Sequence, residues 1–387
     1  MATIISGARI LTPDESIESG DVRIGDDGRI AGVAEAIAEP PSAVRVDMRG
    51  ATLVPGFIDL HVHGGGGFSL ATNHAEEIRS YARWVVRHGV TSFLATICAE
   101  SVAPAMGFVR TAASVAGAIE GGATLLGINL EGPFVSPDRG GALPASWISL
   151  PDGRILEELL EAAEGNLRLM TVAPEVGGAG DLMRKLIERG IVVSVGHSDS
   201  DYAGALAAFR SGASHVTHAF NAMRQFHHRD PGPIGAALES PGVTIEMIAD
   251  GVHLHPAAVR LLVGSFGAGR IALVTDGVAP AGLDGGVFRI GEREARLREG
   301  RMLLDDGTIA GSAATMDGVV RNLVTWNVAG LADAVTMASA VPARVLGLAQ
   351  RKGRLATGFD ADIVALDDDL NVIQTWVGGR AAYSNRV

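Results

Sequence analysis

The chain has 387 residues, of which 47% are hydrophobic and 20% are charged, as expected of a soluble globular protein and not of a disordered one. Its formal net charge of -12 argues against a broad binding surface for a nucleic-acid backbone. The single cysteine, Cys98, excludes an internal disulfide and a thiol-rich metal site.

The N-terminal sequence predicts neither secretion nor membrane insertion. Its first residues, MATIISGARI, lack a basic segment followed by an apolar core, so they do not resemble a signal peptide. No apolar run in the chain reaches the ~20 residues needed to cross a bilayer. We therefore expect a cytoplasmic protein that makes no contact with membranes.

The two ends of the chain share one sequence character. Residues 1–54 contain short alternating apolar runs and turn sequences such as GDDGRI, and residues 350–387 do the same with ADIVAL. Alternation with period two is typical of strands that bury one face. We expect both ends to pair into one small β-sandwich domain beside a larger central domain.

Residues 55–349 alternate short apolar runs with longer amphipathic stretches, a pattern typical of βαβ units and a parallel sheet. Eight such units favour a closed (β/α)8 TIM-like barrel, which takes ~250 residues. A doubly wound open sheet is the alternative, but no G-x-G-x-x-G follows the first strand. A β-hairpin insertion is expected at about 285–311. The eight runs are LVPGFIDL, VTSFLATI, TLLGINL, LRLMTVA, IVVSVG, SHVTHAF, VTIEMIA and IALVT.

Side chains that can bind a metal follow five of these strands, at the end of the barrel where chemistry takes place in this fold. His61 and His63 are two apart, so both point to the same face of a strand. His215 and His218 are three apart and face opposite sides, and His218 is nearer the strand end. Imidazole and carboxylate suit zinc, iron or a similar divalent ion. The candidates are His61, His63, Glu131, His197, His218 and Asp276.

Each candidate alone has a structural alternative. A strand-end histidine can be a hydrogen-bonded core residue, and Asp276 before Gly277 can make a turn. Six such residues after five strands are harder to attribute to coincidence. Lys185 and Lys352 are the only lysines, in a helical stretch and in the tail, so neither can be a carboxylated bridge at the end of strand four. If two ions bind, Glu131 is the expected bridge.

Several segments, taken in order, resemble the amidohydrolase superfamily and, within it, the family of N-acetylglucosamine-6-phosphate deacetylases. HVH marks only the superfamily, whereas LEGPF, THAFNAM and LVTD in this order are specific to the narrower family. The resemblance covers nearly the whole chain. Its segments are PGFIDLHVHG at 55–64, LEGPF at 130–134, GHS at 196–198, THAFNAM at 217–223, IADGVH at 248–253, LVTDGVAPAG at 273–282, GSAATM at 311–316 and GRLATGFDADIVALD at 353–367.

The resemblance implies one or two divalent ions per subunit: zinc, iron, manganese or cobalt. Glu131, His197 and His218 would hold the first ion, the paired histidines a second, and Asp276 would be catalytic. It also implies a phosphorylated amino sugar as ligand and a homodimer whose phosphate ligands come partly from the neighbouring subunit. The implied substrate-binding residues are Ala142, Asn221, Ala222, Arg229, His253, Ala313 and Met316.

The implied activity is metal-dependent removal of the N-acetyl group from N-acetylglucosamine 6-phosphate, giving glucosamine 6-phosphate and acetate. One residue departs from the family's pattern. Leu143 follows Gly-Ala where members carry histidine, and leucine can neither donate nor accept a hydrogen bond. Three alternatives are a deacetylase of N-acetylgalactosamine 6-phosphate, another amide hydrolase and a deaminase of the superfamily. A catalytically silent binding protein is disfavoured because all six ligand-type residues are present.

Overall fold

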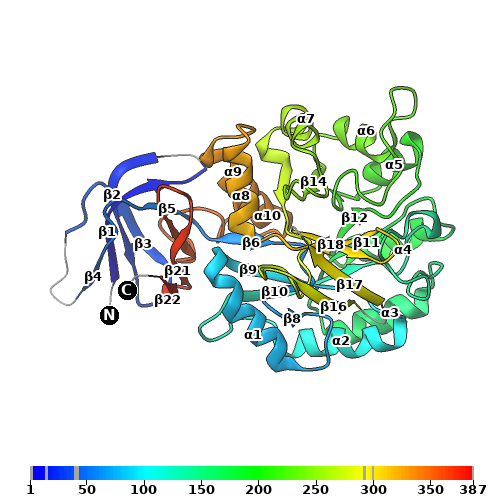
Figure 1. The fold of residues 1–387 in the computed structure, drawn as a ribbon, viewed down its shortest axis with the longest axis horizontal. Helices are drawn as coiled ribbons and strands as arrows, with labels where there is room; N and C mark the ends of the chain where they lie inside the picture. Colours follow the sequence, from blue (N-terminus) through cyan, green and yellow to red (C-terminus); the bar gives the residue numbers. More distant parts are fainter. Residues whose placement is uncertain (1–2, 14–15, 39–42, 291–292, 299, 386–387) are drawn as a thin grey trace.

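The eight apolar runs all form strands in the computed structural model, which describes residues 3–13, 16–38, 43–290, 293–298 and 300–385 (Figure 1). Neighbouring strands are parallel and follow chain order. Most of their residues are buried, because both faces of a barrel strand are covered. The predicted barrel is confirmed. Its strands are β6 (Phe57–Asp59), β9 (Val90–Ile97), β10 (Thr124–Glu131), β11 (Leu167–Val172), β12 (Val192–Val195), β13 (His215–Val216), β14 (Thr244–Met247) and β15 (Ile271–Leu273).

The ring of strands is closed by the segments that follow β6 and β15. Val62 and Gly277 form a parallel bridge there. The backbone N–H of Asp276 donates to the carbonyl of His61 at 2.9 Å, and that of His63 donates to the carbonyl of Gly277 at 2.7 Å. This seam places ligand-type residues from the first and last strands side by side.

Helices surround the ring, and most of them bury one side, whereas the short α6 is buried almost completely (Figure 1). The C-terminus of α4 illustrates how these helices are capped. Gly190, at φ 71°, and Ile191 donate their N–H groups to the carbonyls of Ile187 and Leu186, at 2.9 and 3.0 Å, which satisfies the last turn. The helices are α1 (Ala75–Val85), α2 (Val102–Ser114), α3 (Gly153–Ala163), α4 (Ala179–Glu188), α5 (Tyr202–Arg210), α6 (Gly232–Leu238), α7 (Pro256–Phe266), α8 (Met316–Thr325), α9 (Leu331–Ala338) and α10 (Ala340–Val345), with short 3₁₀ turns η1 (Val86–His88), η2 (Pro137–Arg139) and η3 (Ala268–Arg270).

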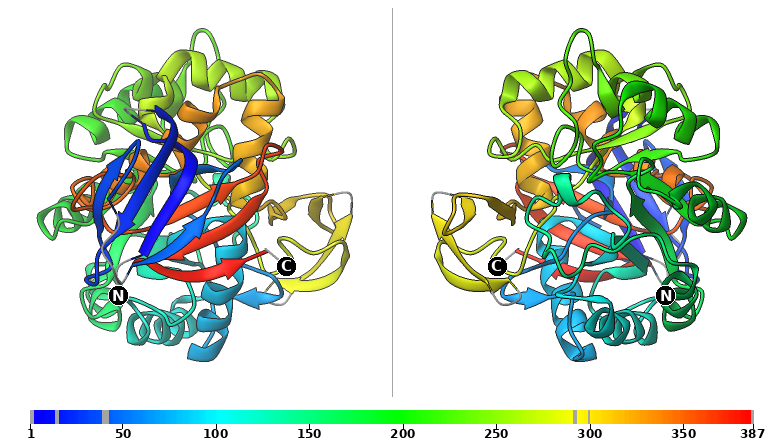
Figure 2. Two further views of the ribbon diagram at one scale, coloured as in Figure 1. Left: turned by 90° about the vertical axis from the view of Figure 1, so that its left-hand side faces the viewer. Right: turned by 90° about the vertical axis from the view of Figure 1, so that its right-hand side faces the viewer.

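Strands from both ends of the chain form one mixed sheet beside the barrel, which confirms that the two termini pair into a common β unit (Figure 2). The N-terminal strands meet the C-terminal ones where residues 52–55 pair antiparallel with residues 363–366. The division of the chain into domains at 54 and 350 stays a prediction. In sheet order the strands are β22 (Arg380–Ser384), β21 (Val372–Val377), β20 (Ile363–Leu366), β5 (Thr52–Pro55), β1 (Thr3–Leu11), β2 (Ser16–Ile24) and β3 (Ile30–Ala34), with β4 (Val44–Asp47) also paired to β1.

The central strands β5 and β20 of this terminal sheet are buried on both faces. Successive side chains in each strand point to opposite sides and so enter different cores. In β5, Leu53 joins a core that belongs to the sheet, whereas Val54 joins the core of the barrel. In β20, Ile363 and Val364 divide in the same way. The sheet is therefore fixed to the barrel through apolar contacts.

The segment after the eighth strand forms an antiparallel sheet of its own, where a hairpin insertion was expected. Figure 2 shows it in yellow at the side of the molecule. Its inner residues, including Leu297 and Met302, pack around Val278. The strands are β16 (Gly286–Ile290), β17 (Arg293–Arg298), β18 (Arg301–Leu304) and β19 (Ile309–Ser312), and a two-stranded sheet pairs β7 (Gly64–Gly65) with β8 (Phe68–Ser69).

Among the described residues, every helix is too short or too polar to span a bilayer.

Candidate metal centre and active site

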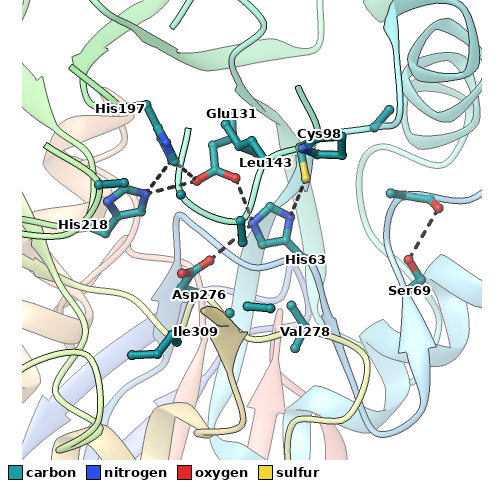
Figure 3. A pocket seen from close by; sticks show the side chains of 18 of the residues that line it. His63, Ser69, Cys98, Glu131, Leu143, His197, His218, Asp276, Val278 and Ile309 are labelled. Atoms are coloured by element: carbon teal, nitrogen blue, oxygen red, sulfur yellow. Dashed lines mark hydrogen bonds and ion pairs between the residues drawn. The ribbon is translucent and has the colours of Figure 1, made fainter. Parts of the chain in front are cut away.

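A cavity of about 420 Å³ opens where the barrel strands end (Figure 3). Its polar part contains the side chains of His63, Glu131, His197, His218 and Asp276. Its walls are mainly apolar, because segments after β9, before α3 and around β19 contribute aliphatic and aromatic side chains. These include Phe108, Leu143, Val278 and Ile309.

Sharp turns directly after the strands aim the polar residues into the cavity. Glu131 is the last residue of β10, whereas His197, His218 and Asp276 follow β12, β13 and β15 after one or two residues. These three have φ values of 46°, 24° and 48°, in the left-handed region that residues with side chains rarely adopt. Such conformations persist where the surrounding structure enforces them, and they concentrate at functional sites.

The first group of ligand-type atoms consists of one carboxylate oxygen and two imidazole nitrogens. Oε1 of Glu131 lies 3.0 Å from Nε2 of His197 and 3.1 Å from Nε2 of His218. The two nitrogens are themselves 3.1 Å apart. A tetrahedral ion with bonds of ~2.0–2.1 Å sets its ligand atoms ~3.3 Å apart, so this triangle is close to the size that zinc requires.

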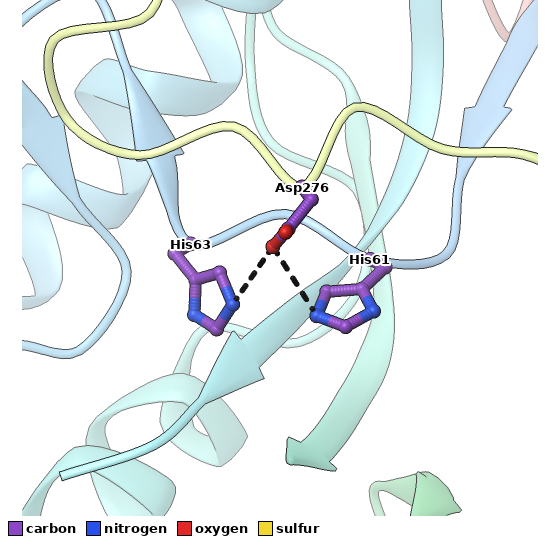
Figure 4. Close-up of side chains that lie close together, drawn as sticks. All are labelled: His61, His63 and Asp276. Carbon is purple, nitrogen blue, oxygen red and sulfur yellow. Dashed lines mark ion pairs between the residues drawn. The ribbon is translucent and has the colours of Figure 1, made fainter. Parts of the chain in front are cut away.

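A second group lies beside the first and comes from the seam of the barrel (Figure 4). Oδ1 of Asp276 is 3.5 Å from Nε2 of His61 and 3.3 Å from Nε2 of His63. Glu131 reaches this group as well, with Oε1 3.5 Å from His61 Nε2 and Oε2 3.3 Å from His63 Nε2. The Glu131 carboxylate is therefore within reach of both groups and could contribute an oxygen to an ion held by either.

The residues of both groups fit a divalent cation. Nε2 of His61 is buried, and no described residue gives it a hydrogen bond. Nδ1 of His197 lies 2.9 Å from the carbonyl of Arg139. That acceptor favours a proton on Nδ1 and leaves the Nε2 lone pair facing Glu131, as in histidines that bind metals. Imidazole and carboxylate together do not select among zinc, iron, manganese and cobalt.

Buried carboxylates face imidazole rings throughout this centre. Burial alone would lower the pKa of His61, but Glu246, Asp276 and Glu131 raise it well above its usual value. Burial alone would raise the pKa of Glu131, yet neighbouring rings, with His61 the strongest, hold it well below its usual value. The pKa of Asp276 is lowered in the same way, against burial, by His61 and His63. An ion bound at these nitrogens would compete with protons for their lone pairs.

Known protein families include one that matches most of this chain. Residues 52–382 match the model of the amidohydrolase family. The chain belongs to that family. The resemblance drawn from the sequence motifs is confirmed.

Curated relatives of this amidohydrolase cover nearly its full length. The N-acetylglucosamine-6-phosphate deacetylase of Bacillus subtilis is 37% identical, and the match covers 99% of this chain and 98% of that protein. The N-acetylgalactosamine-6-phosphate deacetylase of Escherichia coli O157:H7 is 34% identical, over 99% of this chain and 100% of that protein.

A solved structure is equally similar. A mutant N-acetyl-D-glucosamine-6-phosphate deacetylase of Mycobacterium smegmatis, in complex with N-acetyl-D-glucosamine-6-phosphate, is 35% identical with a TM-score of 0.92. The match covers 99% of this chain and 100% of that chain.

The substrate-binding residues expected in this amidohydrolase divide into two sets. Ala142, Asn221, Ala222 and His253 line the cavity. Arg229 is exposed on a separate surface groove, with its Nη1 3.0 Å from Nε2 of His228. Of the remaining two, Met316 begins α8 and is buried in the barrel core, and Ala313 packs against the β16–β19 sheet. Neither lines the cavity.

Two residues at the metal centre of this amidohydrolase were not expected. Sγ of Cys98 lies 4.0 Å from Nδ1 of His63, and Cys98 forms a third cluster of ligand-type atoms with His63 and Glu131. Glu246, in β14, lies beneath His61 and is fully buried. Both could have been found from the sequence, because Cys98 directly follows a predicted strand and Glu246 is a charged residue within an apolar run.

Proposed function

We propose that this amidohydrolase is a metal-dependent deacetylase that converts N-acetylglucosamine 6-phosphate to glucosamine 6-phosphate and acetate. The main support is the pair of ligand groups joined by Glu131 at the base of a cavity that also holds Asp276. Full-length relatives with this activity support the choice of substrate.

Each polar residue has a task in this reaction. Glu131, His197 and His218 would hold one divalent ion, and His61, His63 and Asp276 would face a second. When bound, such an ion lowers the pKa of water toward ~7 and offsets negative charge on the amide oxygen. Asp276 accepts the proton of the attacking water and returns it to the departing amine, a role suited to a carboxylate at the reacting atoms.

In the proposed reaction His253, which lines the cavity, donates a hydrogen bond to the amide oxygen as negative charge develops there. Its Nδ1 is 2.8 Å from Oδ2 of Asp250, which also accepts from the hydroxyl of Ser312 at 3.2 Å. Burial alone would lower the pKa of His253, but the hydrogen bond that its Nδ1 donates to the Asp250 carboxylate raises it. A protonated ring can donate from Nε2 while Asp250 holds its orientation.

A positively charged side chain that binds the substrate's phosphate must come from outside the cavity of a single subunit. No arginine or lysine is among the described residues that line it. Asn221 and the backbone of Ala222 are at hand, and Arg229 faces solvent elsewhere on the subunit. We therefore propose a homodimer in which Arg229 of each subunit completes the phosphate site of the other. We also propose a cytoplasmic location, since the lone Cys98 leaves no internal disulfide to form.

N-acetylgalactosamine 6-phosphate is the second candidate substrate. The relative from Escherichia coli O157:H7 supports it. So does Leu143, which is 8% exposed in the cavity wall and offers the sugar no hydrogen bond.

The decisive experiment measures acetate release from both acetylated sugar phosphates, by the protein as purified and after treatment with a chelator. We expect release from N-acetylglucosamine 6-phosphate that is lost with the chelator and restored by added Zn²⁺, Mn²⁺, Fe²⁺ or Co²⁺. Full activity in metal-free protein, or no release from either sugar phosphate, would contradict the proposal.

The shared site is tested by mixing two variants that are each strongly impaired with the phosphorylated substrate, Arg229→Ala and Asp276→Asn. In a mixed dimer one of the two sites has both native residues. Random exchange of subunits should therefore restore roughly a quarter of the wild-type activity. A mixture no more active than its components would show that Arg229 does not serve a neighbouring site.

A further inference from the structure

Glu246 is a buried carboxylate beneath the metal centre that has no part in the chemistry described so far. It lies in β14, within the apolar run VTIEMIA, and is 0% exposed. Burying a carboxylate is costly unless it is paired and hydrogen-bonded. Its contacts therefore indicate what it does.

The first contact is to His61. Oε2 of Glu246 lies 2.9 Å from Nδ1 of His61. A carboxylate accepts hydrogen bonds, so this contact places a proton on Nδ1 and leaves the lone pair on Nε2. Nε2 is the atom that faces Glu131 and Asp276 at 3.5 Å.

The second contact is to the main chain of His218. The same oxygen, Oε2 of Glu246, accepts the backbone N–H of His218 at 2.9 Å. His218 is at φ 24°, so its backbone needs support from neighbours. One carboxylate oxygen thus holds a residue from each ligand group, His61 from the second and His218 from the first.

The other oxygen faces His215. Oε1 of Glu246 is 3.3 Å from Nε2 of His215, although the two atoms are not aligned as a hydrogen bond. Nδ1 of His215 is 2.6 Å from the hydroxyl of Thr244. The carboxylate is therefore enclosed by His61, His215 and the His218 backbone.

We propose that Glu246 is the positioning residue of the second ion site. By fixing the tautomer and orientation of His61, it determines whether His61, His63 and Asp276 can bind a second ion beside the one at Glu131. The inference rests on the metal-dependent function proposed above. The first ion depends on Glu246 less, because the carbonyl of His218 also accepts the N–H of Asn221 at 2.9 Å.

The test compares Glu246→Met with Glu246→Gln. Methionine has no strong acceptor, so His61 loses its partner, whereas the glutamine oxygen can still accept from His61 and from His218. Zn²⁺ bound per subunit is measured by elemental analysis, and the dissociation constants are measured by competition with a chelator. Loss of such a supporting partner typically weakens metal affinity ~10–100-fold.

We expect two ions in the wild type and in Glu246→Gln. In Glu246→Met we expect one ion, with the second bound ~10–100-fold more weakly. Met247→Ala, which leaves a cavity in the same buried strand, is the control for loosening of the barrel and should keep both ions. Circular dichroism of the metal-free variants checks that each is folded.

The proposal is overturned if Glu246→Met keeps both ions at wild-type affinity, or if Glu246→Gln loses as much affinity as Glu246→Met. Equal loss in Met247→Ala, or a wild type that never binds more than one ion, would overturn it too. None of these measurements uses a substrate. A protein that binds two ions but releases no acetate would refute the proposed function and leave the role of Glu246 intact.

Discussion

Replacement of Asp276 by asparagine tests the proposed chemistry with little disturbance of the fold. The backbone of Asp276 is held at both ends, since its N–H donates to His61 at 2.9 Å and its carbonyl accepts from Ser312 at 2.8 Å. Its φ of 48° is a conformation that asparagine tolerates, whereas alanine would add ~1–2 kcal/mol of strain. Asparagine therefore removes the proton acceptor and the charge while keeping the turn.

The size of the effect follows from the role of Asp276 in proton transfer. Loss of a positioned acid or base typically reduces the rate ~10²–10⁴-fold, which corresponds to about 3–5 kcal/mol in the activation barrier. Because Oδ1 also faces His61 and His63 at 3.5 and 3.3 Å, the second ion should bind more weakly as well. The first ion, at Glu131, should stay.

The assay measures kcat and KM for acetate release at saturating Zn²⁺, with bound metal determined on the same sample. Asp305→Asn, at a side chain that is 77% exposed, is the matched control and should behave as the wild type. An Asp276→Asn protein with its first ion bound and kcat within a factor of about five of the wild type would refute the assigned role, since general acid–base catalysis contributes far more than that.

Three further substitutions probe other parts of the structure. Arg229→Ala should reduce kcat/KM ~10–100-fold for a phosphorylated substrate and hardly at all for its unphosphorylated analogue; equal losses would remove the phosphate role. Leu143→His should raise kcat/KM ~2–10-fold for one of the two sugar phosphates by adding a hydrogen bond, and a drop with both would show that leucine suits the native substrate. Lys352→Met should lower the free energy of unfolding by ~3 kcal/mol, because the Lys352 ammonium lies 2.5 Å from buried Asp362. The free energy of unfolding is measured by denaturant titration, with Arg49→Met at an exposed position as the control. Equal losses in the two variants would contradict this prediction.

Much of the fold could be predicted because the local patterns agree with one another. Each of the eight apolar runs is the length of a buried strand, and the helical stretches between them bury one side. The ligand-type residues converge for a topological reason, since parallel strands in a ring bring their carboxyl ends together. His61 and Glu131 could therefore be predicted to meet although they are far apart in the sequence.

The rest of the site depends on contacts that the sequence does not encode locally. Glu246 stands out as a charge within an apolar strand, but its partner His61 is known only once the ring is built. Cys98 follows a strand, but its neighbour His63 is likewise known only once the ring is built. The direction of Arg229 cannot follow from the loop HHRDPG, because a loop residue takes its position from whatever packs against it.

The seam between the first and last barrel strands has a consequence for protein synthesis. His61 leaves the ribosome early, but Asp276, which shares its ligand group, leaves only after the eighth strand has been made. A chain that stops short of this point has the first histidine pair and Glu131 but lacks Asp276. Truncated translation products should therefore be unable to hydrolyse substrate, and the cell gains an active enzyme only from chains whose barrel has closed.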